Sequence, residues 1–207
     1  FHFLDGGTAE SYFSDISPDD PVIITLSHAG IQRFHDISGG AAAVFKQPVL
    51  RDRIPEMRIW AALSYHAGRQ GELLSSLGTI PTIRRKDFIK FGLGHIPQAQ
   101  TDPVKEAMFD TSVEFLCEEP GRTLDVFPAG TKGATELQNG VASVASRVPG
   151  VLIVPISMTS PREQSGAFFG NIPWGMEVVY GAIQEPHPAA TIESIVSSLQ
   201  RAHDDAY

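Results

Sequence analysis

The chain has 207 residues, a length typical of one domain with its own core, and its 42% hydrophobic and 19% charged residues exclude a disordered protein. Its formal net charge of −8 argues against nucleic-acid binding, because that function needs a basic surface. One cysteine, Cys117, excludes an internal disulfide and a cysteine metal site, and its apolar neighbours predict a buried side chain.

The chain contains no apolar run of about 18 residues, so the sequence predicts no transmembrane helix in it. It begins at Phe1 rather than Met. We therefore expect a targeting peptide, a propeptide or an anchor helix to precede it in the full protein.

The first half of the chain predicts strands that alternate with helices. The apolar run 21–26 predicts a buried strand that ends at Ser27-His28. The other elements expected here are an edge strand at 1–6, a loop at 8–20, the start of a helix at 38–47, a helix at 57–68, and a short helix, a glycine turn and a short strand within 71–87.

The second half continues the alternation. Residues 102–121 predict a helix, with Pro103 in its first turn and Pro120-Gly121 at its end. The other elements expected here are a strand running into a glycine loop at 123–133, a helix at 137–148, strands at 150–158 and 176–183, and an amphipathic helix at 191–207. The aromatic segment 166–176 predicts a hairpin loop over the core or, alternatively, a contact with a membrane or an acyl chain.

This order predicts an α/β fold with a mostly parallel central sheet flanked by helices. We expect one domain, 1–207, with an N-terminal strand and loop (1–20), a core (21–186) and a C-terminal helix (187–207). In such sheets chemistry gathers at the carboxyl ends of the strands. Two candidate segments occupy such ends, Ser27-His28 and Phe127–Lys132.

Four blocks in this order carry a recognisable pattern. Their residues are His28 after an apolar strand; Gly78, Ile80, Pro81, Arg84 and Arg85; Phe127, Pro128, Gly130 and Thr131; and Val154 and Pro155. Across residues 20–186 they resemble the glycerolipid acyltransferase family, which comprises lysophosphatidic acid and glycerol-3-phosphate acyltransferases. Two positions depart from the family pattern. Arg33 stands five residues after His28, where the family has Asp, and Ala129 stands where most members have Glu.

The resemblance implies that His28 is the general base and that a carboxylate orients its ring. The nearest acid after His28 is Asp36, eight positions on. Either the loop carries an insertion that returns Asp36 to the site, or the His-Asp dyad is broken. Alternatively, His28 is a relic or a capping residue, the His35-Asp36 pair is an ordinary turn or helix cap, or His35 replaces His28. The resemblance further implies that the acceptor alcohol attacks the thioester of the acyl donor directly, without an enzyme nucleophile. The sequence has no G-x-S-x-G nucleophile motif.

The resemblance also implies a phosphate site. Arg84 and Arg85 would bind the acceptor phosphate, and Lys132, which stands near Gly130, would help to bind it. The backbone N–H groups of the Phe127–Thr131 turn would face an anion. Alternatively, the arginines form a solvated surface run and the turn only connects two elements. The histidines show no metal-ligand spacing, and no cofactor is expected beyond acyl-CoA or acyl carrier protein as co-substrate.

Two functions follow as hypotheses. One is acyl transfer to a lysophosphatidic acid or glycerol-3-phosphate type hydroxyl, or to another headgroup. The other is a catalytically degenerate relative that acts as an accessory subunit of a larger complex, which Arg33 and Ala129 favour. We expect peripheral association with a membrane surface, with an organelle as one compartment that fits, and no nucleic-acid partner.

Overall fold

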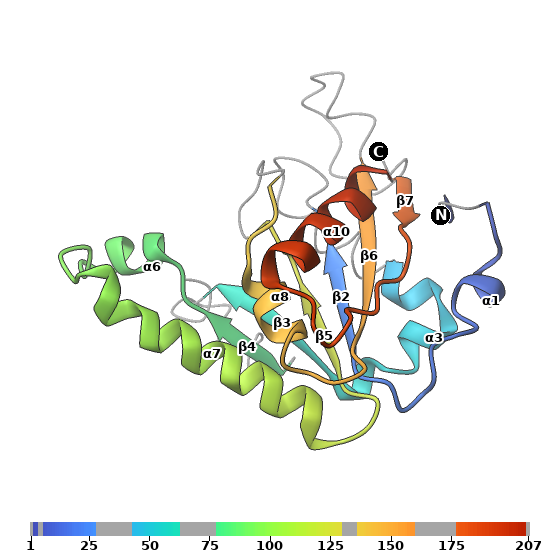
Figure 1. The fold of residues 1–207 in the computed structure, drawn as a ribbon, viewed down its shortest axis with the longest axis horizontal. Helices are drawn as coiled ribbons and strands as arrows, with labels where there is room; N and C mark the ends of the chain where they lie inside the picture. Colours follow the sequence, from blue (N-terminus) through green and yellow to red (C-terminus); the bar gives the residue numbers. More distant parts are fainter. Residues whose placement is uncertain are drawn as a thin grey trace.

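The computed structural model describes six stretches of the chain, which form one sheet with helices on both faces (Figure 1). They are residues 2–3, 6–27, 43–62, 78–129, 136–159 and 177–205. In these stretches seven strands pair in the order β1-β7-β6-β2-β5-β3-β4. Their bounds are β1 (His2–Phe3), β2 (Val22–Leu26), β3 (Met57–Ala62), β4 (Thr79–Thr82), β5 (Thr123–Val126), β6 (Leu152–Thr159) and β7 (Glu177–Tyr180).

The sheet is mostly parallel. Strands β6, β2, β5, β3 and β4 all run in one direction, so their carboxyl ends lie along one edge. Strand β7 is antiparallel to β6, and β1 pairs parallel to β7 at the outer edge. The predicted α/β class, the mostly parallel sheet and the N-terminal edge strand are therefore confirmed.

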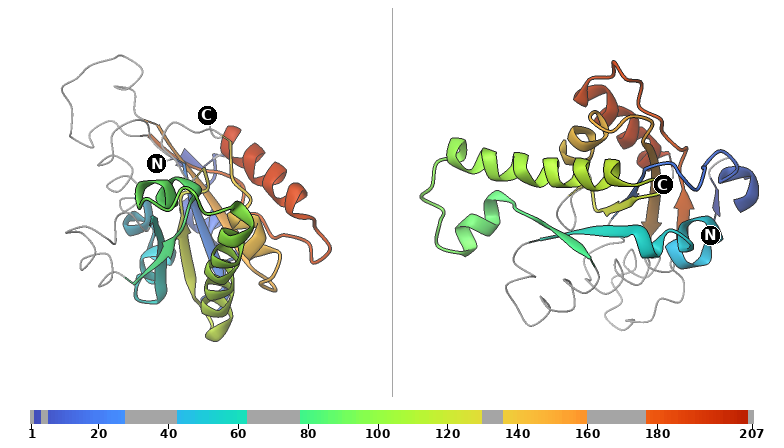
Figure 2. Two further views of the ribbon diagram at one scale, coloured as in Figure 1. Left: turned by 90° about the vertical axis from the view of Figure 1, so that its left-hand side faces the viewer. Right: turned by 90° about the horizontal axis from the view of Figure 1, so that it is seen from below.

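Helices cover the two faces unequally. Helices α7, α8 and α10 lie together on one side of the sheet (Figure 2), and the opposite face receives α1, α3 and the helical residues 43–46. Their bounds are α1 (Ala9–Tyr12), α3 (Pro48–Arg51), the short 3₁₀ helix η1 (Ile54–Glu56), α6 (Arg85–Lys90), α7 (Gln98–Glu118), α8 (Gly140–Ala145) and α10 (Ile192–Asp204).

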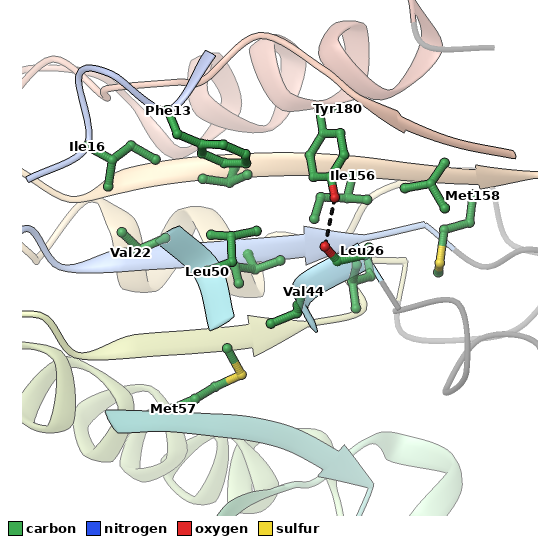
Figure 3. Packing of buried hydrophobic residues seen from close by; sticks show 14 residues of the cluster. Phe13, Ile16, Val22, Leu26, Val44, Leu50, Met57, Ile156, Met158 and Tyr180 are labelled. Atoms are coloured by element: carbon green, nitrogen blue, oxygen red, sulfur yellow. Dashed lines mark hydrogen bonds between the residues drawn. The ribbon is translucent and has the colours of Figure 1, made fainter. Parts of the chain in front are cut away.

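The core on the α1 and α3 face is apolar and closely packed (Figure 3). Leu26 of β2, Ile156 of β6 and Leu50 of α3 are at most 1% exposed. The Tyr180 hydroxyl is buried among them and donates a hydrogen bond of 2.7 Å to the Ala43 carbonyl oxygen. This bond ties β7 to the helix that precedes α3.

The opposite face has a second apolar core. Ile23, Leu124 and Ile153 are 0% exposed and belong to one cluster with Val144 of α8 and Leu199 of α10. Because β2 and β6 are buried on both faces, their side chains are mostly apolar, as expected for central parallel strands, whereas the equally buried β5 also carries Thr123 and Asp125.

A buried histidine attaches α10 to the sheet. The His203 ring is 3% exposed, and its Nε2 and Nδ1 atoms lie 3.1 Å from Thr25 Oγ1 and 3.0 Å from Ser157 Oγ. Burial lowers the pKa of the His203 imidazole to about 4, and the Asp204 carboxylate only partly opposes this effect. The ring is therefore neutral near pH 7, with one nitrogen donating and the other accepting.

We expect His203 to weaken the fold in acid. An unfolded histidine takes up a proton below about pH 6.5, while native His203 stays neutral until about pH 4. The free energy of unfolding should therefore fall over this window, by up to ~3 kcal/mol. Urea unfolding between pH 7 and pH 4 measures this loss, and His203→Gln should flatten it. The exposed-site variant His187→Gln should keep the wild-type slope, and an unchanged slope in His203→Gln would refute the assignment.

The described part of one predicted helix, residues 57–62, is a strand, and residues 63–68 lie outside the described part of the chain. Residues 57–68 have helical spacing, yet 57–62 form β3, which pairs with β4 and β5. Met57 and Ala61 are buried, whereas the Trp60 indole nitrogen donates to Ser112 Oγ of α7 at 2.9 Å. The prediction was wrong because short apolar runs fit both periodicities, and here pairing with strands distant in sequence decides the structure.

The predicted loop at 8–20 contains a short helix, α1. Thr8 Oγ1 accepts from the Ser11 backbone N–H at 3.2 Å, and Ser11 Oγ accepts from the Thr8 backbone N–H at 3.1 Å. These two reciprocal hydrogen bonds form a capping box, which stabilises the start of a helix. The polar composition of the segment predicted a loop, so the helix was missed.

Helix α7 begins earlier than predicted. It starts at Gln98, so Pro103 lies inside the helix rather than in its first turn, and it ends before Pro120 as expected. Cys117 is exposed, which corrects the prediction of a buried side chain. Its neighbour Leu116 is 2% exposed and occupies the inward position, so the phase of the helix turns Cys117 outward.

Candidate functional site

The carboxyl edge of the sheet places the ends of β2 and β5 side by side. Thr25 of β2 is paired with Val126 of β5, so Ser27 and Phe127 leave neighbouring strand ends (Figure 1). These are the points where the first and third blocks of the sequence begin. The two segments that sequence analysis selected are thus adjacent at their start.

Ser27 is fixed by β6. Its backbone N–H donates to the Ile156 carbonyl oxygen at 2.9 Å, and its Oγ accepts from the Met158 backbone N–H at 2.8 Å. The chain is therefore held by strand-like contacts up to the residue that precedes His28. His28 itself, together with Arg33, His35 and Asp36, lies outside the described residues.

The turn after β5 begins in the core. Phe127 is half-buried and packs against the α1 and α3 face, and Pro128 and Ala129 are buried. The Pro128 carbonyl oxygen accepts from the Gln138 backbone N–H at 2.9 Å, which ties the turn to the segment before α8. The rest of this block, Gly130, Thr131 and Lys132, lies outside the described part of the chain.

A buried acid, which sequence analysis did not select, lies on β5. Asp125 is 8% exposed, and its Oδ1 has no hydrogen-bond partner among the residues that the structure describes. It is paired with Ile24 of β2 and Ile59 of β3, so apolar strands lie on both sides of it. Burial raises the pKa of the Asp125 carboxyl to about 7, and a hydrogen bond with the Val126 backbone partly opposes this. A charged residue between Leu124 and Val126 was the available signal.

Arg84 lies at the same edge but farther along the sheet, since β3 separates β4 from β5. It is the N-cap residue of α6, and its Nε and Nη2 donate to the two carboxylate oxygens of Asp87, each at 2.9 Å. Asp87 is 2% exposed and also accepts from the Arg84 backbone N–H at 2.9 Å. This bidentate pair orients the guanidinium. Arg85 is the first residue of α6.

The described residues thus place the strands that lead to two of the predicted groups side by side, and the third group farther along the sheet. The chain just before His28 and the turn beginning at Phe127 lie on adjacent strands, with Arg84 two strands from Phe127. Within the stretches that the structure describes, no three His, Cys, Asp or Glu side chains are grouped so that they could bind a metal ion. No helix in those stretches is long and apolar enough to cross a membrane.

Comparisons with known proteins leave the family undetermined. No family model matches the sequence, and no curated protein sequence matches it either.

Proposed function

We propose that the protein is a glycerolipid acyltransferase that moves a fatty acyl group from acyl-CoA or acyl carrier protein to a lysophosphatidic acid or glycerol-3-phosphate type hydroxyl. The observation that supports it best is the pairing of β2 with β5. It brings the strand that leads to His28 beside the strand that leads to Phe127-Pro128, the two segments that the resemblance assigns to one site.

In this proposal His28 takes the proton of the acceptor hydroxyl while its oxygen attacks the thioester carbonyl carbon. The tetrahedral intermediate collapses, the thiolate leaves, and His28 returns the proton to the sulfur. Asp36 would orient the imidazole. The backbone N–H groups of the turn that begins at Phe127 and Pro128 and continues through Gly130 and Thr131 would stabilise negative charge.

The acceptor phosphate would be bound by Arg84, Arg85 and Lys132. Asp87 binds Nε and Nη2 of Arg84 and so fixes the orientation of its guanidinium group. Arginine held in one orientation by a buried carboxylate loses little side-chain freedom on binding, which suits a phosphate site.

A second candidate is a catalytically degenerate acyltransferase-like protein that serves as an accessory subunit of a larger, organellar complex. The Arg84–Asp87 pair favours it, because it gives this arginine a structural role at the start of α6. Arg33 and Ala129, the two departures from the family pattern, favour it as well. Under either candidate we propose peripheral association with a membrane.

Transfer of a labelled palmitoyl group from CoA or from acyl carrier protein to lysophosphatidic acid and to glycerol-3-phosphate separates the two candidates. We expect wild-type turnover with at least one acceptor, and His28→Ala should lose about 10²- to 10⁴-fold because general-base catalysis contributes that much. His187→Ala removes an exposed histidine outside the proposed site and should keep wild-type activity. No turnover by folded wild type with either donor carrier would favour the accessory subunit.

A further inference from the structure

Exposed apolar side chains are concentrated at the end of α6. Ile89 is 61% exposed, Phe91 42% and Leu93 41%, and Lys90 between them is exposed as well. We call residues 89–93 the α6 tip. Single exposed apolar residues are ordinary, but three within five consecutive exposed residues indicate a contact surface.

The α6 tip has a defined backbone. Gly92 has φ +76°, and the Leu93 N–H donates to the Phe88 carbonyl oxygen at 2.7 Å, as in a Schellman helix end. The Ile96 N–H then donates to the Leu93 carbonyl oxygen at 3.1 Å. At the other end of α6 the buried carboxylate of Asp87 caps the helix. The apolar side chains are therefore presented by hydrogen-bonded structure.

The α6 tip projects from the protein, so it is placed to contact another molecule or a membrane. Helix α6 and the first turns of α7 extend away from the sheet beyond β4 (Figures 1 and 2). Helix α6 begins three residues after the carboxyl end of β4. The α6 tip thus comes shortly after the carboxyl end of β4 in the chain, and this end belongs to the same edge of the sheet as the proposed acyltransferase site.

The local charge is opposite to that of the whole chain. Residues 84–95 contain four arginine or lysine residues and one acid, whereas the protein carries a formal net charge of −8. The cations are Arg84, Arg85, Lys86 and Lys90, and the acid is Asp87. Apolar side chains flanked by cations match the chemistry of a bilayer surface with anionic headgroups.

We propose that the α6 tip inserts into the headgroup region of a bilayer that contains anionic lipid. A protein partner fits less well, because a stable interface engages about 20–30 residues on each side and the projecting tip offers only a few. The exposed apolar side chains of the tip and the cations around it support this insertion independently of the acyltransferase proposal. Its consequence, that the edge carrying the site faces the lipid substrate, rests on the proposed function.

Vesicle flotation tests this inference. The probe is unilamellar vesicles of phosphatidylcholine with phosphatidylglycerol at about 30 mol%, compared with phosphatidylcholine alone. The triple variant Ile89→Ser, Phe91→Ser, Leu93→Ser should bind at least about tenfold more weakly than wild type, because three inserted apolar side chains are lost. Phe45→Ser is the matched control, since Phe45 is 57% exposed outside the tip, and it should bind like wild type.

Tryptophan fluorescence gives a second test, which does not require a variant with weaker vesicle binding. Because the chain already contains Trp60 and Trp174, each variant is compared with wild type. Adding anionic vesicles should shift the emission of Phe91→Trp further to the blue than that of wild type, whereas Phe45→Trp should show no such additional shift. Circular dichroism checks that each variant is folded. The inactive His28→Ala protein should still float, so loss of catalysis and loss of membrane binding are separable. The proposal is overturned if folded wild type does not float, if the triple variant floats equally well, or if the tip mediates self-association in place of vesicle binding.

Discussion

Asp125→Asn is expected to stabilise the protein strongly at pH 8. Burial raises the pKa of this carboxyl to about 7, so the native state holds the proton more tightly than the unfolded chain, where the pKa is near 3.9. The free energy of unfolding therefore falls as pH rises from about 4 to about 7 and is level above that window. A neutral amide of the same shape removes this loss, which amounts to up to about 4 kcal/mol at pH 8.

Chemical denaturation of wild type and Asp125→Asn at pH 4 and pH 8 measures the effect. The two proteins should differ little at pH 4 and most at pH 8. Asp15→Asn, which changes an exposed acid, should show no such pH-dependent gain. If Asp125→Asn is instead destabilised at pH 8, the carboxylate has a compensating partner and the assignment of an uncompensated buried acid is wrong.

Arg53→Met is expected to destabilise the protein by about 3–5 kcal/mol, because it deprives three buried or partly buried carbonyl oxygens of a charged donor. Arg53 is 5% exposed. Its Nη1 donates to the Asp20 carbonyl at 2.8 Å and to the Gly121 carbonyl at 3.4 Å, and its Nη2 donates to the Ser17 carbonyl. The side chain thus joins the loop before β2 to the turn before β5.

Thermal and urea unfolding measure this loss, with the neighbouring exposed residue as control. Arg51→Met should change the free energy of unfolding by less than about 0.5 kcal/mol, as is usual for surface positions. Arg53→Lys should fall between wild type and Arg53→Met, because one ammonium group cannot reproduce the planar fork. Equal stability of Arg53→Met and Arg51→Met would show that the three carbonyls do not depend on Arg53.

The central strands could be predicted from the sequence because burial on both faces leaves a continuous apolar run. Strands β2 and β6 are examples, and the elbow at Ser27 marks where such a run ends. Strand β3 could not be predicted in this way. Its pairing with β4 and β5 depends on residues distant along the chain, and local periodicity carries no information about them.

The strand ends at the candidate site could be predicted for a similar reason. The strand ends that carry it are local features of the sequence, so Ser27 and Phe127 could be assigned to one edge once the sheet was expected to be parallel. The partner of Arg84 and the burial of Asp125 arise from packing. The sequence contains a signal for each. Asp87 stands three residues after Arg84, and Asp125 is a charged residue inside an otherwise buried strand, but neither position belongs to the four blocks that carry the resemblance.

The most direct test of the proposed site is to find where the acceptor binds. A short-chain lysophosphatidic acid that carries a photoreactive group on its glycerol moiety would be crosslinked to the protein, and the labelled peptides identified by mass spectrometry with unmodified lysophosphatidic acid as competitor. We predict competed label in the segments around His28 and Phe127–Lys132. Competed label confined to α7, α8 and α10, or no competed label at all, would contradict a glycerolipid site at the carboxyl edge of the sheet.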